Sequence, residues 1–135
     1  MNNFSKFCKL VADVDLTSFF SGNEGGLVTI FVPVNAAFDG VDLDEMPVTT
    51  RRNIVLTHLT AGSVTAESLV CGEDIKTLLG MSVSTTQCFE VTLGKAQVGF
   101  FNDESDLPMI LSPNDMELCN GLVQPINNLI RVINF

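Results

Sequence analysis

The stretch Thr29–Phe38, TIFVPVNAAF, decides the fold. Its first half is rich in β-branched and apolar residues and stops at Pro33, which is typical of a strand. Asn35 follows, and its side chain is predicted to cap a helix that begins at Ala36. A second apolar segment, Asn120–Val132 (NGLVQPINNLIRV), opens with Asn-Gly, a strong turn signal. Both segments are predicted to supply core strands of one compact domain.

The remaining patterns place helices early in the chain and strands late. Helical periodicity predicts helices over Phe4–Val11, Leu16–Phe20 and Arg51–Leu59, with a helical turn over Thr65–Val70. Alternation and β-branched content predict strands over Leu27–Val32, Met81–Thr85, Phe89–Leu93, Gln97–Phe101, Met109–Leu111, Gly121–Pro125 and Leu129–Ile133. A tight hairpin is expected at Leu93-Gly94-Lys95. This order favours an α+β fold over alternating βαβ units, in one domain spanning residues 1–135.

Charge and composition exclude several function classes. The chain has 7 basic and 16 acidic residues, for a net charge of −9, so it would repel a phosphate backbone or an anionic membrane. Nucleic-acid binding is therefore not expected. Ten Phe and no Trp or Tyr leave the chain without the commonest interface anchors and sugar-stacking rings. No apolar run reaches the roughly 18 residues of a membrane span, and the N-terminus lacks the apolar stretch of a signal peptide.

The cysteines are even in number, which permits two disulfides. Cys71 precedes the strand-rich region and Cys88 opens one of its strands, so the short loop between them favours a Cys71–Cys88 bridge. Cys8–Cys119 then follows by elimination. The alternative is four buried free thiols in a reducing compartment. None of the spacings is typical of a zinc site or a Cys-x-x-Cys redox motif.

These motifs carry a family resemblance that covers nearly the whole chain. TIFVPVNAAF resembles the first signature of fasciclin-type adhesion domains, T-x-F-x-P-x-N-x-A-F, and the fixed positions all match: Thr29, Phe31, Pro33, Asn35, Ala37 and Phe38. NGLVQPINNLI, with Asn120 and Gly121, resembles the second signature. The segment Asn53–Leu69 is similar to the family's central helix, histidine and glycine turn. The resemblance implies a β-sandwich core with several helices packed around it.

The resemblance also implies binding residues. In the family a tyrosine-histidine pair and an Asp-Ile pair are linked to adhesion, and Thr57-His58 and Asp115-Met116 occupy the corresponding positions. Thr57 replaces the aromatic residue. From the residues alone, His58 lies on the same helix face as Ile54 and is predicted to be a buried imidazole bonded to backbone or Thr. Asp115 alternatively belongs to a Pro-Asn-Asp turn.

Acidic loops raise the question of a metal. Asp39–Glu45 and Asp103–Asp106 are rich in carboxylates, which calcium prefers as ligands. The order of acids does not match an EF-hand, so solvated loops are favoured, and no metal or other cofactor is predicted.

The sequence therefore predicts a non-catalytic, extracellular adhesion or matrix module that binds a protein partner through its surface, with homophilic pairing as one option. The expected location is secreted or cell-surface, with any signal or anchor outside this sequence. The first alternative is a ligand-binding or structural matrix domain. A small hydrolase is least favoured, because a lone histidine without an orienting carboxylate or a nucleophile motif offers no catalytic set.

Overall fold

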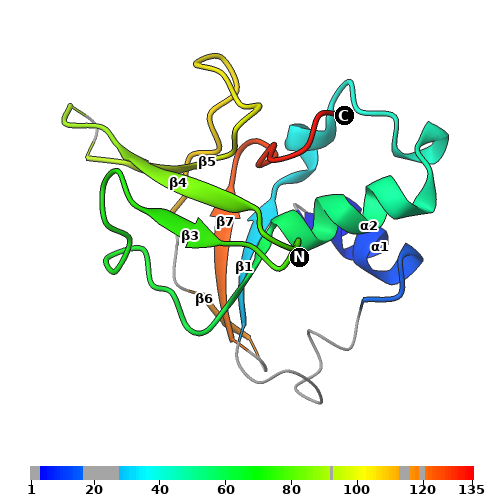
Figure 1. Cartoon of the computed structure of the whole chain (residues 1–135), viewed down its shortest axis with the longest axis horizontal. Coiled ribbons are helices and arrows are strands. Elements are labelled where there is room, and N and C mark those ends of the chain that lie inside the picture. Colours follow the sequence, from blue (N-terminus) through cyan, green and yellow to red (C-terminus); the bar gives the residue numbers. More distant parts are fainter. Residues whose placement is uncertain (1–3, 17–27, 92, 113–115, 119–120) are drawn as a thin grey trace.

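The computed structural model describes residues 4–16, 28–91, 93–112, 116–118 and 121–135, without the side chains of 116–118 and 121. Its elements form two β-sheets and two α-helices, an α+β arrangement. Helix α1 (Ser5–Asp13) and helix α2 (Val48–Thr57) contact each other and lie to one side of strand β1 (Figure 1). The Arg52 side chain donates to the carbonyl of Val14 (3.0 Å), which ties α2 to the C-terminal end of α1.

The larger sheet pairs strands from opposite ends of the sequence. Its order is β2-β1-β7-β6, with β1 at Val28–Pro33, β2 at Leu59–Ala61, β6 at Met116–Leu118 and β7 at Gly121–Ile126. β1 and β7 are parallel, in a register that runs from Val28 opposite Gly121 to Pro33 opposite Ile126. Parallel neighbours need a long crossover connection, and here most of the chain lies between the two strands. The two signature segments are therefore neighbours at the centre of the fold.

The smaller sheet is an antiparallel meander with the order β3-β4-β5. Its strands are β3 (Asp74–Lys76), β4 (Val83–Cys88) and β5 (Lys95–Val98). The end of β4 is held by the predicted Cys71–Cys88 disulfide. Strand β2 is tied to β3 and to the residues that follow it: the Thr60 hydroxyl donates to the Lys76 carbonyl (2.6 Å), and the Leu78 amide donates to the Leu59 carbonyl (2.9 Å).

Strand β1 is buried along its whole length because both of its faces are covered. Ile30 and Val32 pack with the inward faces of the helices, which include Leu10 of α1 and Ile54 of α2. Phe31 belongs instead to a second cluster, with Leu69, Ile126 and Ile130. Burial on both faces explains why the strand reads as an almost continuous apolar run.

The signature residues have separate structural tasks. The Thr29 hydroxyl donates to the Gly62 carbonyl and accepts from the Val64 amide, both at 2.8 Å, so it anchors the loop after β2. Pro33 ends β1, and Phe38 is buried in the 3₁₀-helix η3 (Asn35–Phe38), where Ala37 is half-buried. Gly121 begins β7 opposite Val28. Asn120 lies outside the described residues.

Several predicted boundaries are wrong. Phe89–Leu93 is not a strand, because its described residues form the turn between β4 and β5. Leu129–Ile133 is irregular, because its backbone bonds to side chains instead of a strand. The helix predicted from Arg51 begins at Val48 and ends at Thr57, so that Leu59 belongs to β2. β2 and β3 have three residues each and leave too little alternation to detect. Of Leu16–Phe20, only the buried Leu16 is described.

The predicted Cys8–Cys119 bridge is wrong, because Cys8 carries a free thiol. Its position next to Phe7 suggests that Cys8 belongs to the buried apolar face of α1. The helix instead buries Phe7, Leu10 and Val11 and leaves Cys8 exposed on the outer face. Cys119 lies outside the described residues.

Asn35 caps a helix, but a different one from that predicted. The 3₁₀-helix that it begins has no side-chain cap. Its carboxamide oxygen instead accepts from the Lys6 amide (2.9 Å), and its nitrogen donates to the Ser5 hydroxyl (3.0 Å). The first turn of α1 would otherwise leave that amide without an intrahelical partner. A residue of the core signature thus fixes the N-terminal helix.

Asn35→Ala should lower the free energy of unfolding by about 1 kcal/mol, because it removes a helix cap. Urea unfolding and thermal melting would measure the loss. The matched control is Asn134→Ala, which changes an exposed asparagine near the C-terminus. Equal stability of the two variants would show that the Asn35 cap contributes nothing.

Candidate functional site

His58 is held in one orientation by two backbone groups. It follows the last turn of α2 and its side chain is fully buried, with the edge of the Phe7 ring against it (centroids 5.9 Å apart). Nδ1 lies 2.7 Å from the Ile54 carbonyl, and Nε2 lies 2.9 Å from the Ile130 amide nitrogen. An amide can only donate, so Nε2 accepts and Nδ1 carries the proton. The buried imidazole that the sequence predicts is confirmed.

Burial lowers the pKa of His58 from 6.5 to about 4, and only the hydrogen bond to the Ile54 carbonyl opposes this shift. The ring is therefore neutral at physiological pH. Both nitrogens are occupied by backbone groups, and neither is open to solvent. A general base or a metal ligand needs a free lone pair within reach of its target, so His58 is structural in this fold.

Thr57 is buried together with its neighbour. Its side chain is 2% exposed, and its hydroxyl donates to the Asn53 carbonyl one helical turn earlier (2.8 Å). Neither Thr57 nor His58 presents a side chain to the surface. The structure thus corrects the expectation that the Thr57 and His58 side chains contact a partner. The resemblance to the family's tyrosine-histidine pair gave their positions in the sequence but not their accessibility.

The second predicted pair lies across the larger sheet. Met116 begins β6, and its neighbour Asp115 is outside the described residues. The register places Met116 opposite Val123, Val123 opposite Ile30 and Ile30 opposite Leu59, the residue after His58. At about 4.8 Å per strand spacing, Met116 and Leu59 are roughly 14 Å apart. Met116 and the strand that follows His58 therefore lie at opposite edges of the larger sheet.

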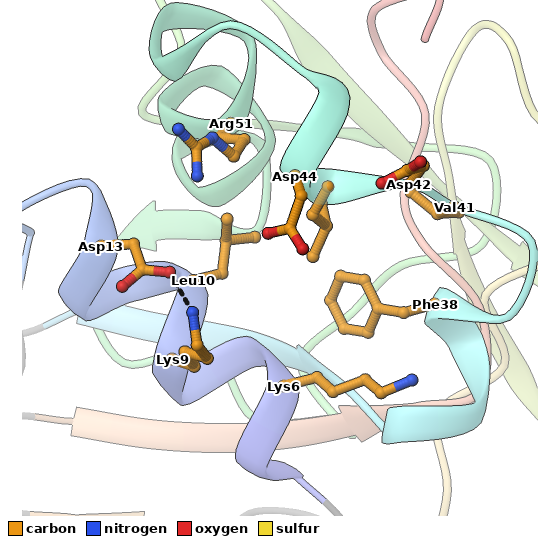
Figure 2. Close-up of a pocket in the computed structure, with 10 residues that line it drawn as sticks. Lys6, Lys9, Leu10, Asp13, Phe38, Val41, Asp42, Asp44 and Arg51 are labelled. Carbon is orange, nitrogen blue, oxygen red and sulfur yellow. Dashed lines mark hydrogen bonds and ion pairs between the residues drawn. The ribbon is translucent and has the colours of Figure 1, made fainter.

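A hollow of about 270 Å³ lies between α1, η3, the 3₁₀-helix η4 (Leu43–Glu45) and α2 (Figure 2). Leu10 and Phe38 contribute apolar surface, and Lys9 pairs with Asp13 (2.7 Å) on one side. This ion pair raises the pKa of Lys9, but it is largely exposed and contributes little to stability. The other residues that line the hollow are Lys6, Val41, Asp42, Leu43, Asp44 and Arg51. The hollow therefore combines apolar side chains with charged side chains of both signs.

Comparison with known proteins identifies the family. A model of the fasciclin domain matches residues 2–132. The chain belongs to the fasciclin domain family. The fold agrees with a solved structure of a FAS1 domain pair from the insect cell adhesion molecule fasciclin I, at a TM-score of 0.72 and 15% identity. That match covers 97% of this chain and 46% of the other, so the chain spans about half of the solved pair. No curated protein matched.

Within the described part of this fasciclin domain, no three acidic, histidine or cysteine side chains gather closely enough to hold a metal ion. Nor is any described helix long and apolar enough to cross a membrane. What the surface does offer is apolar side chains in turns. The most exposed are Met81, Val91, Leu93 and Phe100, each at least 86% exposed. Sequence reasoning missed them because it assigned all four residues to strands.

The stability of the fasciclin domain should fall as pH decreases from about 6.5 to about 4. In this window the unfolded chain binds a proton at His58 and the folded chain does not, so acid favours unfolding. The full difference in pKa corresponds to roughly 3 kcal/mol. Urea unfolding at a series of pH values would measure the slope.

His58→Gln is the control for this titration. It should be less stable than wild type at pH 7, because an amide cannot reproduce both ring contacts, and its stability should vary less between pH 6.5 and 4. Parallel pH profiles for the two proteins would contradict the assignment of the slope to His58.

Proposed function

We propose that this fasciclin domain is a non-catalytic, extracellular interaction module that acts in adhesion through its surface. The observation that carries the proposal is the state of the one histidine. His58 is neutral, buried and bonded on both ring nitrogens, so it serves the core. The remaining chemistry of the domain lies in exposed carboxylates, cations and apolar side chains, which are groups that bind.

Four further observations support the proposal. The family match spans residues 2–132, in keeping with one domain over the whole chain, and the fold resembles a domain pair of an insect cell adhesion molecule. The Cys71–Cys88 disulfide suits an oxidising compartment. A net charge of −9 favours a protein partner over nucleic acid or anionic lipid.

Two parts of the surface are candidates for the contact. Met116, which begins β6 at one edge of the larger sheet, stays a candidate together with its sequence neighbour Asp115, because the pair resembles a family motif that is linked to adhesion. The hollow beside α1 supports the alternative function, binding of a small ligand. Arg51 lines it, and the Arg51 Nε atom is buried without a hydrogen-bond partner among the described residues.

Dense display should make a weak interaction measurable. Linking many copies on one bead converts later contacts into intramolecular ones and raises avidity by a factor of about 10² to 10⁴. Beads coated densely with the domain should therefore cluster, or bind to cell layers or deposited matrix, far more than sparsely coated beads. Counting bound and clustered beads under flow gives the measurement.

Beads that carry a scrambled sequence are the negative control, and Asp115→Ala with Met116→Ala tests the β6 edge while the fold is kept. Reduced binding by this variant would support the edge as the contact. Absence of both binding and clustering at every density, together with turnover of a small substrate, would overturn the adhesion proposal.

A further inference from the structure

The turn that follows β5 presents two phenylalanine side chains to solvent. Phe100 is 86% exposed and Phe101 is 45% exposed, and their rings meet edge to face with centroids 5.1 Å apart. The segment, gold in Figure 1, projects from the body of the molecule. The other phenylalanines among the described residues are buried or half-buried. The pair is therefore not explained by the core.

The turn is held rigidly by the Asn102 side chain. Its oxygen accepts from the amides of Gly99 and Arg131, both at 2.9 Å, and its nitrogen donates to the Leu129 carbonyl (3.0 Å). The same nitrogen donates to the Asp106 carbonyl (3.2 Å). One amide thus joins the two ends of the turn to the C-terminal segment.

The backbone of the aromatic pair is fixed as well. The Phe101 amide donates to the Arg131 carbonyl (2.7 Å). Gly99 passes so close to this carbonyl that an added Cβ would lie 2.4 Å from it, so only glycine fits there. Asp106 pairs with the Arg131 guanidinium (3.4 Å). The two rings are consequently presented by a backbone that needs little ordering when a partner binds.

This combination is what a binding anchor requires. Exposure of large apolar side chains to water is unfavourable, and such side chains are found together at sites that another protein covers. Interface hot spots are often large side chains that fill a pocket on the partner, and a preorganised backbone lowers the entropy lost on binding. In a chain without Trp or Tyr, the Phe100–Phe101 pair is the aromatic pair that the described surface offers.

Charge around the pair selects the partner. Asp103 and Glu104 follow the pair after Asn102, and both are exposed. Hydrogen bonds from the Ser105 hydroxyl and amide lower the pKa of Asp103 and so favour its ionised form. A second copy of the chain would bring a surface of net charge −9 against these carboxylates, which is repulsive. A partner with basic residues around an apolar pocket would instead be attracted.

We propose that Phe100 and Phe101 are the apolar anchors of a docking surface for a basic partner protein, whose apolar pocket is bordered by lysine or arginine. Asp103 and Glu104 contribute attraction and orientation. This inference rests on the proposed interaction function and names the surface that carries it.

The test uses a short amphipathic peptide of lysine and leucine as the probe, with a glutamate-leucine peptide as its counterpart. In an NMR titration of the domain, the lysine peptide should perturb the backbone amides of residues 99–106 most strongly, and the glutamate peptide should not. Phe100→Ser with Phe101→Ser should weaken the lysine peptide's binding about tenfold or more. Met81→Ser with Val91→Ser, which removes even more exposed apolar side chains elsewhere, should leave it unchanged.

Three outcomes would overturn the inference: shifts spread over the acidic surface instead of this turn, equal loss in the two serine variants, or self-association of the domain that the phenylalanine variant abolishes. Beads coated with the variants separate the two proposals. If wild-type beads neither bind to any surface nor cluster, the proposed adhesion function is wrong. If wild-type and Phe100→Ser, Phe101→Ser beads bind equally well, the docking surface alone is wrong.

Discussion

The hydrogen bond from the Ile130 amide to His58 Nε2 joins residues that lie 72 positions apart. On one side it depends on α2, because the Ile54 carbonyl sets the tautomer of the ring. On the other side it fixes the irregular segment after β7. Water cannot replace either bond in this buried site, and an unpaired amide there would be costly. The ring thus connects the end of α2 to the segment after β7. This contact adds to the pairing of β1 with β7, two strands from distant parts of the sequence.

Rigidity extends from this bond to the surface. Arg131 directly follows Ile130, and its amide and carbonyl hold Asn102 and Phe101. The segment that the histidine orders is therefore the platform on which the aromatic turn is built. This arrangement relates a buried, non-catalytic histidine to the proposed docking surface: the residue does not touch a partner, but it supports the backbone that would. The proposed docking surface then depends on packing in the core.

The sequence predicted the α+β class, the two signature strands, the buried imidazole and the Cys71–Cys88 bridge, because apolar patterning and spacing are local properties. It misplaced what depends on distant partners. Asn35 was expected to cap its own turn and instead caps α1, to which only the tertiary fold brings it. Phe100 was assigned to a strand because its composition suits one, whereas Asn102 and Gly99 turn the chain there. Burial of Thr57 could not be read from a motif position.

Native-state amide hydrogen exchange tests the central claim most directly, namely that His58 supports the aromatic turn through the C-terminal segment. The account predicts that the amides of Ile130, Arg131 and Phe101 exchange as slowly as the Thr86 amide in β4. In His58→Gln, those three should lose far more protection than Thr86 does. Fast exchange of the Phe101 and Arg131 amides in the wild-type domain, or equal loss at all four sites in the variant, would contradict it.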